Sequence, residues 1–170
     1  NHFAMWPSSA RQAIFFASKT RSNEAVYAGE VIGKFMERAY RRPVTESEVE
    51  RKLALFRKLR EREPSFEHTI VSTLTAVLCS PNFLLLSEPE STKVSESINL
   101  EKRRIDDYEL ASRLSYFLWS SMPDETLFDL AKQKKLHQKE TLIAQTRRML
   151  ADPKSKAFSE NFAAQWLDLA

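Results

Sequence analysis

Only 2 of the 170 residues in this chain are glycine. Glycine supplies the positive φ angles of tight hairpin turns and the close backbone approach of loops that bind phosphate. An average composition would put about twelve glycines in a chain of this length. The scarcity therefore argues against a many-stranded β fold, a Rossmann domain or a P-loop enzyme, and it favours a mainly helical protein.

The two glycines also have an informative position. Gly29 and Gly33 lie in one expected helix, and with Ala25 they form a stripe of small residues at helical spacing. Each glycine costs a helix about 1 kcal/mol relative to alanine. We therefore expect a second helix to cross this stripe, where small residues allow a close approach.

The rest of the composition is that of a globular protein, with 42% hydrophobic and 29% charged residues and a net charge of +3. The single cysteine, Cys79, excludes an internal disulfide, a CxxC redox pair and the CxxCH motif that attaches c-type haem. Because no catalytic base neighbours it in the sequence, we expect Cys79 to be a buried, inert thiol. The chain has no apolar run of about 18 residues, so we expect no membrane span.

Apolar residues recur at helical spacing through most of the chain, and they predict an all-α fold. Two capping boxes, at Thr45–Glu48 and Asp106–Glu109, mark the starts of helices. The pattern predicts about eight helices, at roughly 9–19, 22–41, 45–62, 66–79, 106–119, 121–131, 139–150 and 152–167.

The helical pattern lapses once, in a stretch rich in serine and glutamate that cannot bury much apolar surface. We therefore expect two packed helical subdomains, residues 1–86 and 106–170, joined by an exposed linker at 87–105. The chain begins with Asn1 instead of methionine, has no signal-peptide pattern and ends inside an apolar helical pattern. These features predict a fragment of a longer protein, with the second subdomain truncated at its end.

The sequence assigns no catalytic, cofactor-binding or metal-binding residue. Its three histidines are scattered without the HxxxH spacing of zinc sites, and His68 is expected to be a solvated or hydrogen-bonded helix residue. The acidic residues Asp106, Asp107 and Glu109 fit helix capping better than metal binding or acid–base catalysis.

Two basic stretches are candidate binding surfaces. One is the end of the second predicted helix, with Arg38, Arg41 and Arg42. The other is residues 131–156, a stretch that contains eight lysines or arginines and only two acidic residues. No helix-turn-helix signature or interleaving of aromatic and basic residues accompanies it, so a solvated face is expected and nucleic-acid binding is not. The residues of this face that we single out are Lys132, Lys134, Lys135, Arg147 and Arg148.

Four stretches resemble known domains. Residues 35–45 and 76–84 resemble one helical domain of unknown function in large planctomycete proteins. Residues 108–125, and 147–153 with 162–167, resemble the adjacent domain of the same proteins. The resemblance implies an exported, extracytoplasmic or periplasmic protein in which other domains of the chain are partners. It also implies a neighbouring cytochrome c module that would carry the haem, since this chain lacks the CxxCH motif. It implies no catalytic residue.

Three functions remain open. The first is a non-catalytic structural or interaction module of an exported, cytochrome-c-associated multidomain protein. The second is part of an enzyme whose site is completed by domains outside this fragment, for which the residues to test are Arg38, Arg41, Arg42, Asp107 and Arg113. The third is polyanion binding through the basic face at 132–156.

Overall fold

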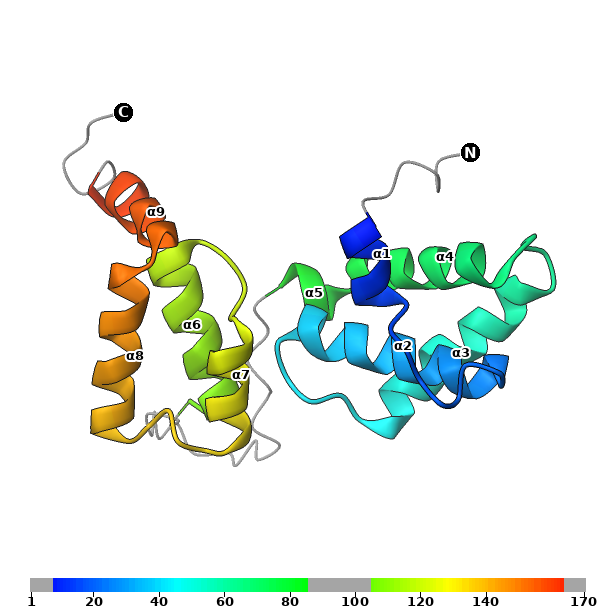
Figure 1. Cartoon of the computed structure of the whole chain (residues 1–170), viewed down its shortest axis with the longest axis horizontal. Coiled ribbons are helices and arrows are strands. Elements are labelled where there is room, and N and C mark those ends of the chain that lie inside the picture. Colours follow the sequence, from blue (N-terminus) through cyan, green and yellow to red (C-terminus); the bar gives the residue numbers. More distant parts are fainter. Residues whose placement is uncertain (1–7, 86–104, 164–170) are drawn as a thin grey trace, which may run out of the picture. The chain divides into compact units, whose positions relative to one another are not determined.

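The structure is a computed structural model, which describes the backbone of residues 8–85 and 105–163 and the side chains of 11–85 and 105–162. Every regular element in these ranges is helical, which confirms the all-α prediction (Figure 1). The chain divides into two compact units, unit 1 (Asn1–Ser87) and unit 2 (Glu88–Ala170). The predicted linker, residues 87–105, lies outside the described residues except for Ile105.

Unit 1 is built on three helices, each of which packs against the other two. A side chain caps the N-terminus of each of these helices: Asn23, Thr45 and Ser65 accept hydrogen bonds from amides in the first turn. A short helix precedes the three and another follows them. The helices are α1 (Ser8–Ile14), α2 (Glu24–Tyr40), α3 (Glu46–Arg60), α4 (Phe66–Leu78) and α5 (Pro81–Leu84).

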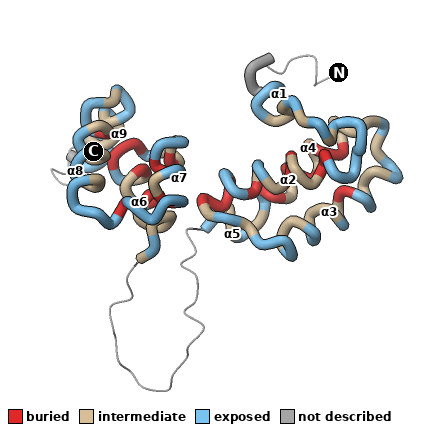
Figure 2. Tube along the Cα trace, turned by 60° about the horizontal axis from the view of Figure 1, so that its bottom comes forward, coloured by how far each residue is buried: buried red, intermediate tan, exposed pale blue. Residues whose placement is uncertain are grey.

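The core of unit 1 is drawn mainly from α2 and α4, where Figure 2 shows most of its buried residues. The expected crossing at the glycines is confirmed. A Cβ atom placed on Gly29 would lie 3.5 Å from Cδ1 of Leu53, and one placed on Gly33 would lie 3.8 Å from Cγ2 of Val49. Both partners belong to α3. These are ordinary contact distances, so α3 packs against the stripe through side chains and an alanine would also fit.

Two sequence expectations for unit 1 are wrong. The first helix ends at Ile14 instead of near residue 19, and the carbonyl of Phe16 beyond it accepts a hydrogen bond from the Tyr27 hydroxyl at 2.8 Å. Cys79 is exposed instead of buried. The buried face of α4 ends at Val77, and the last residue of the helix, Leu78, is itself exposed. Cys79 follows that end and falls outside the core.

Unit 2 is built around the helix at Asp107–Trp119, which packs against the three other described α-helices of the unit. Its core includes Leu127 and Met149 together with Trp119, whose indole Nε1 donates a hydrogen bond to the Met149 carbonyl at 2.9 Å. A capping box begins the central helix, as the sequence predicts. The elements are α6 (Asp107–Trp119), α7 (Glu125–Lys132), α8 (Lys139–Ala151), a 3₁₀ turn (Pro153–Ser155), α9 (Lys156–Phe158) and a π turn (Ser159–Ala163).

The described ranges contain nine α-helices against the eight expected, because the short helix α5 has no apolar periodicity to announce it. No helix in these ranges is long and apolar enough to cross a membrane. Among the described residues, three have left-handed backbone conformations, Arg41 (φ 59°), Ser120 (φ 50°) and Lys134 (φ 54°), and both glycines have ordinary φ angles.

Candidate functional site

Arg41 connects the end of α2 to α5. It is only 6% exposed and occupies the left-handed C-cap position of α2, where its amide donates to the Arg38 carbonyl. Arg38 itself is exposed in the last turn of α2. A guanidinium presents five N–H donors, and here it neutralises the partial negative charge of carbonyls at helix ends. It donates at 3.2–3.4 Å to the carbonyls of Ala39, Asn82, Phe83 and Leu85.

Arg42 forms a two-point ion pair with Glu48, with N–O distances of 2.7 and 3.1 Å. Glu48 also accepts the Thr45 amide as the second half of the predicted capping box. The hydrogen bond from Arg42 is the largest influence on this carboxylate, and it lowers the pKa of Glu48 to about 2 from an ordinary 4.5. Arg42 therefore anchors the α2–α3 connection.

Asp107 ties the start of α6 to the connection between α7 and α8. Its carboxylate accepts the Leu136 amide at 2.8 Å and lies 3.7 Å from Nε2 of His137. The same imidazole nitrogen donates to the Ile105 carbonyl at 2.9 Å. Arg113, six residues after Asp107 along α6, is exposed. The structure thus gives Asp107 a role in joining helices.

Arg148 forms a second contact between helices of unit 2, which joins α8 to the start of α7. Its guanidinium donates to both carboxylate oxygens of Asp124, the N-cap of α7, at 2.7 and 3.2 Å, and lies 5.4 Å from the ring centre of Trp119. Burial raises the pKa of Asp124, but hydrogen bonds from Arg148 and the Leu127 amide outweigh it, so the pKa is lowered overall. Lys154 lies over the same indole at 4.7 Å.

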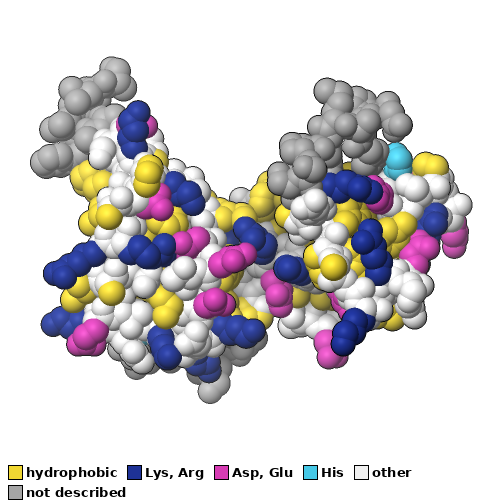
Figure 3. Space-filling view, viewed as in Figure 1, with side chains coloured by type: hydrophobic (Ala, Val, Ile, Leu, Met, Phe, Trp, Pro, Cys, Tyr) yellow, Lys and Arg dark blue, Asp and Glu magenta, His cyan; other side chains and the backbone are white. Residues whose placement is uncertain are grey.

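The remaining residues of the basic face, Lys132, Lys134, Lys135 and Arg147, are all exposed. In Figure 3 the lysine and arginine side chains on the visible face of unit 2 stand apart, with acidic side chains between some of them. No described residue forms an ion pair with these four. Within the same basic stretch Arg148 is held by Asp124, Lys154 lies over Trp119 and Lys156 pairs with Glu160, so Lys132, Lys134, Lys135 and Arg147 are among its exposed cations without an ion pair to a described residue.

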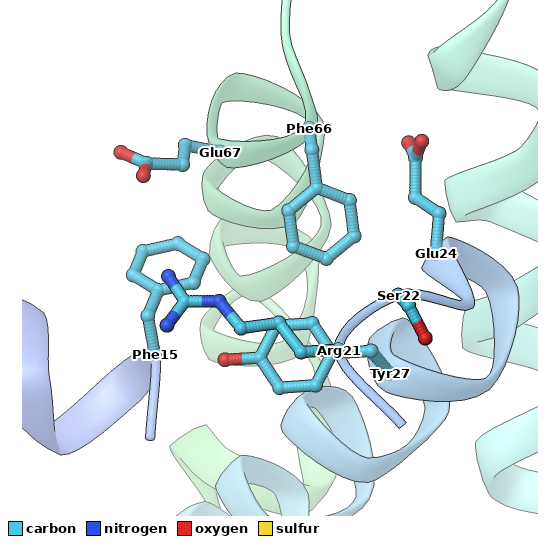
Figure 4. A pocket seen from close by; sticks show the side chains of 7 residues that line it. All are labelled: Phe15, Arg21, Ser22, Glu24, Tyr27, Phe66 and Glu67. Carbon is cyan, nitrogen blue, oxygen red and sulfur yellow. The ribbon is translucent and has the colours of Figure 1, made fainter. Parts of the chain in front are cut away.

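Sequence reasoning missed a cavity of about 260 Å³ in unit 1, here called the aromatic pocket. It lies where the α1–α2 connection meets the first turns of α2 and α4. The rings of Phe15, Tyr27 and Phe66 line it, with Arg21, Glu24 and Glu67 at the same opening (Figure 4). No local motif announces it, because its walls come from segments about 50 residues apart. The sequence signal for this pocket is the pair Phe15 and Phe16, two large apolar side chains directly after the end of the first helix.

The described ranges hold no group of three or more His, Cys, Asp or Glu side chains that could bind a metal ion. His68, near the start of α4, is hydrogen-bonded through Nδ1 to the hydroxyl of its N-cap Ser65 at 2.7 Å, in line with the sequence expectation. Within each unit, the candidate residues with defined contacts serve packing and capping. The aromatic pocket is a cavity of the described chain that is lined by both rings and charged side chains.

Comparisons with known proteins agree with the two-unit division. Residues 27–88 match the family described as PSD5: Protein of unknown function (DUF1595), and residues 105–170 match the family described as PSD4: Protein of unknown function (DUF1592). No curated protein and no solved structure matches the chain. The stretches that resemble known domains fall inside these two matches, at 35–45 and 76–84 in the first and from residue 108 onward in the second. The chain therefore carries two adjacent domains of unknown function, DUF1595 followed by DUF1592.

Proposed function

We propose that this chain is a non-catalytic structural or interaction module of an exported multidomain protein that also contains a c-type cytochrome module. Its place would be the periplasm or another extracytoplasmic compartment, and its partners would be the other domains of the same long chain. The adjacent DUF1595 and DUF1592 domains support this proposal, as does the resemblance to planctomycete proteins of that architecture.

One observation carries the non-catalytic part of the proposal. Among the candidate site residues, four each hold a helix end or helix against another segment of their own unit: Arg41, Arg42, Asp107 and Arg148. Removing a charged group from such a contact destabilises the unit, and most strongly for Arg41, which is buried. Replacing these residues should therefore change stability and leave no catalytic signature.

The interaction part of the proposal can be tested with the cytochrome module of the full-length protein. The 170-residue chain, isotopically labelled, would be titrated with that module and with an unrelated c-type cytochrome of similar charge. We expect shifted amide signals with the first partner only. Absence of binding to the native module would contradict the interaction role, and turnover by the isolated chain that one side-chain change abolishes would refute the non-catalytic one.

The enzyme hypothesis requires polar residues to converge on a substrate site. Arg38, Arg41 and Arg42 lie in unit 1, whereas Asp107 and Arg113 lie in unit 2. In unit 1, Arg41 and Arg42 point into separate contacts, with α5 and with Glu48. Within unit 1, these separate contacts favour the structural module over a catalytic centre built from Arg41 and Arg42.

Polyanion binding is a second candidate function, because Lys132, Lys134 and Lys135 are exposed and form no ion pair with any described residue. Exposed cations of this kind attract polyanions in proportion to their number and lose affinity steeply with added salt. Polyphosphate binding by the chain should then weaken when all three lysines become glutamine. The matched control replaces Lys19, Lys58 and Arg62, which are exposed cations of unit 1. An equal loss in both variants would rule out a specific face.

A further inference from the structure

The aromatic pocket offers a wall of rings at two orientations. Phe66 stacks on Tyr27, with ring centres 5.7 Å apart and planes inclined by 23°, and it lies 6.4 Å from Phe15 at 60°. Tyr27 is buried and fixed through its hydroxyl to the Phe16 carbonyl. The cavity of about 260 Å³ is at the small end of ligand pockets. These walls suit a small ligand with a flat, apolar body.

The charged side chains around the pocket indicate whether the polar group of such a ligand would be anionic or cationic. Glu24 is ion-paired with Arg60 and Glu67 with Arg11, so both carboxylates already have a cation. Arg21 is exposed, and no described residue pairs with its guanidinium. Arg11 and Arg60 do not line the pocket, but they balance the charge of its two carboxylates, so Arg21 is the charged lining residue whose side chain has no ion pair with a described residue. Figure 4 shows the Arg21 side chain extended across the pocket towards Phe15.

The backbone adds to this positive potential. The pocket lies beside the first turns of α2 and α4, helices of 17 and 13 residues, and helix N-termini carry partial positive charge. Glu24 and Glu67 each lie in one of these first turns, but their charge is met by the arginines. An anionic group is therefore favoured at the opening and a cationic one is not.

We propose that the aromatic pocket binds a small organic carboxylate whose flat apolar body lies against Phe15 and Phe66 and whose carboxylate pairs with Arg21. The planar guanidinium matches a carboxylate through two parallel N–H donors. This ligand site goes beyond the proposed function, because it concerns unit 1 alone and needs no cytochrome partner. Its failure would leave the interaction role of the chain untouched.

The test uses the whole chain and three probes of related shape: phenylacetate, phenethylamine and acetate. Binding would be followed by ligand-observed and amide NMR. We expect phenylacetate to bind and to shift signals of residues around the pocket. Phenethylamine should not bind, since it brings a cation to a positive opening, and acetate should not bind, since it lacks the ring. Preference for phenethylamine, or equal binding of acetate, would overturn the proposal.

Two variants locate the site. Arg21→Gln should weaken phenylacetate binding about tenfold, the usual effect of losing a hydrogen bond to a charged group. Arg62→Gln removes an exposed arginine of the same unit that does not line the pocket, and it should leave the affinity unchanged. Phe15→Leu should also weaken phenylacetate binding, by removing one ring. If Arg21→Gln binds as the parent chain does while its circular dichroism is unchanged, the assignment is wrong.

Discussion

At the scale of single residues, several charged side chains of this protein hold helix ends against neighbouring segments. Arg41 holds α5 to α2, Arg42 holds the capping box of α3, and Asp107 holds the α7–α8 connection. The Arg41 guanidinium satisfies carbonyls at helix ends that would otherwise bond to water, whereas Arg42 and Asp107 act through a side chain and through the amide of a connecting segment. Charged clusters that look like candidate binding or catalytic sites in the sequence, such as Arg41 and Arg42 at the end of α2, therefore have structural roles in the fold.

The Arg42–Glu48 pair should make unit 1 sensitive to acid. Because the pKa of Glu48 is lowered to about 2 in the folded protein, its contribution is fully present above about pH 4.5 and is lost as the pH falls towards 2. Glu48 is 12% exposed and Arg42 36%, so we expect Glu48→Gln to cost about 2 kcal/mol at neutral pH after allowance for solvent screening.

Urea unfolding across this pH range, followed by far-UV circular dichroism, measures the effect. The difference between the parent chain and Glu48→Gln should shrink towards zero near pH 2. Glu50→Gln is the matched control, because its ion pair with Arg57 is well exposed on both sides. A difference that does not change with pH would contradict the role of the ion pair.

The left-handed residues make a second prediction at this scale. Lys134 is exposed and no described residue pairs with it, so Lys134→Gly should stabilise unit 2 by about 1 kcal/mol through relief of its positive φ. Arg41→Gly relieves the same strain but loses the buried hydrogen bonds to α5, and it should destabilise unit 1 by about 2 kcal/mol. Thermal unfolding of the two variants should shift in opposite directions.

At the scale of elements, the helix starts marked by capping boxes were predictable, whereas the end of the first helix and the buried extent of a helix face were not. The capping boxes at Thr45 and Asp106 depend on residues three apart, so the sequence alone predicts them correctly. The burial of Cys79 depends on where the packed face of α4 ends, which is set by its neighbours. The aromatic pocket depends on three segments meeting, and no local pattern carries that information.

The crossing of α2 and α3 can be tested through its glycines. Since the side chains of Leu53 and Val49 leave room for a methyl group, Gly29→Ala and Gly33→Ala should each stabilise unit 1 by about 0.5–1 kcal/mol through helix propensity. Gly29→Leu should instead destabilise it, because a larger side chain would collide with Leu53. Denaturant midpoints of the three variants decide the matter; a stable Gly29→Leu would show that α3 does not pack there.

At the scale of the whole molecule, two hydrophobic cores serve two domains. The first core comes from α2, α3 and α4, and the second comes from α6, α7 and α8 with the turn that follows α7. The structure divides the chain between Ser87 and Glu88, and the linker predicted at 87–105 stays a prediction. Each unit has its own capped helices and its own core, which is what a folding unit requires.

The two units should therefore unfold separately. Ile32→Ala empties a fully buried site in α2 and should cost unit 1 about 2–5 kcal/mol. Amide hydrogen exchange should then speed up in α2, α3 and α4 and stay unchanged in α6, α7 and α8. Met149→Ala, in the core of unit 2, should show the reverse pattern. Equal acceleration in both units after either change would mean that they unfold as one.

The placement of glycine also bears on the unfolded chain. Left-handed positions that glycine usually fills are held here by arginine, serine and lysine, and the connecting segments contain no glycine at all. A chain with so few glycines has fewer backbone conformations open to it before it folds. Each unit thus gives up less backbone entropy when it orders, and this allows two small cores to support two separate helical domains.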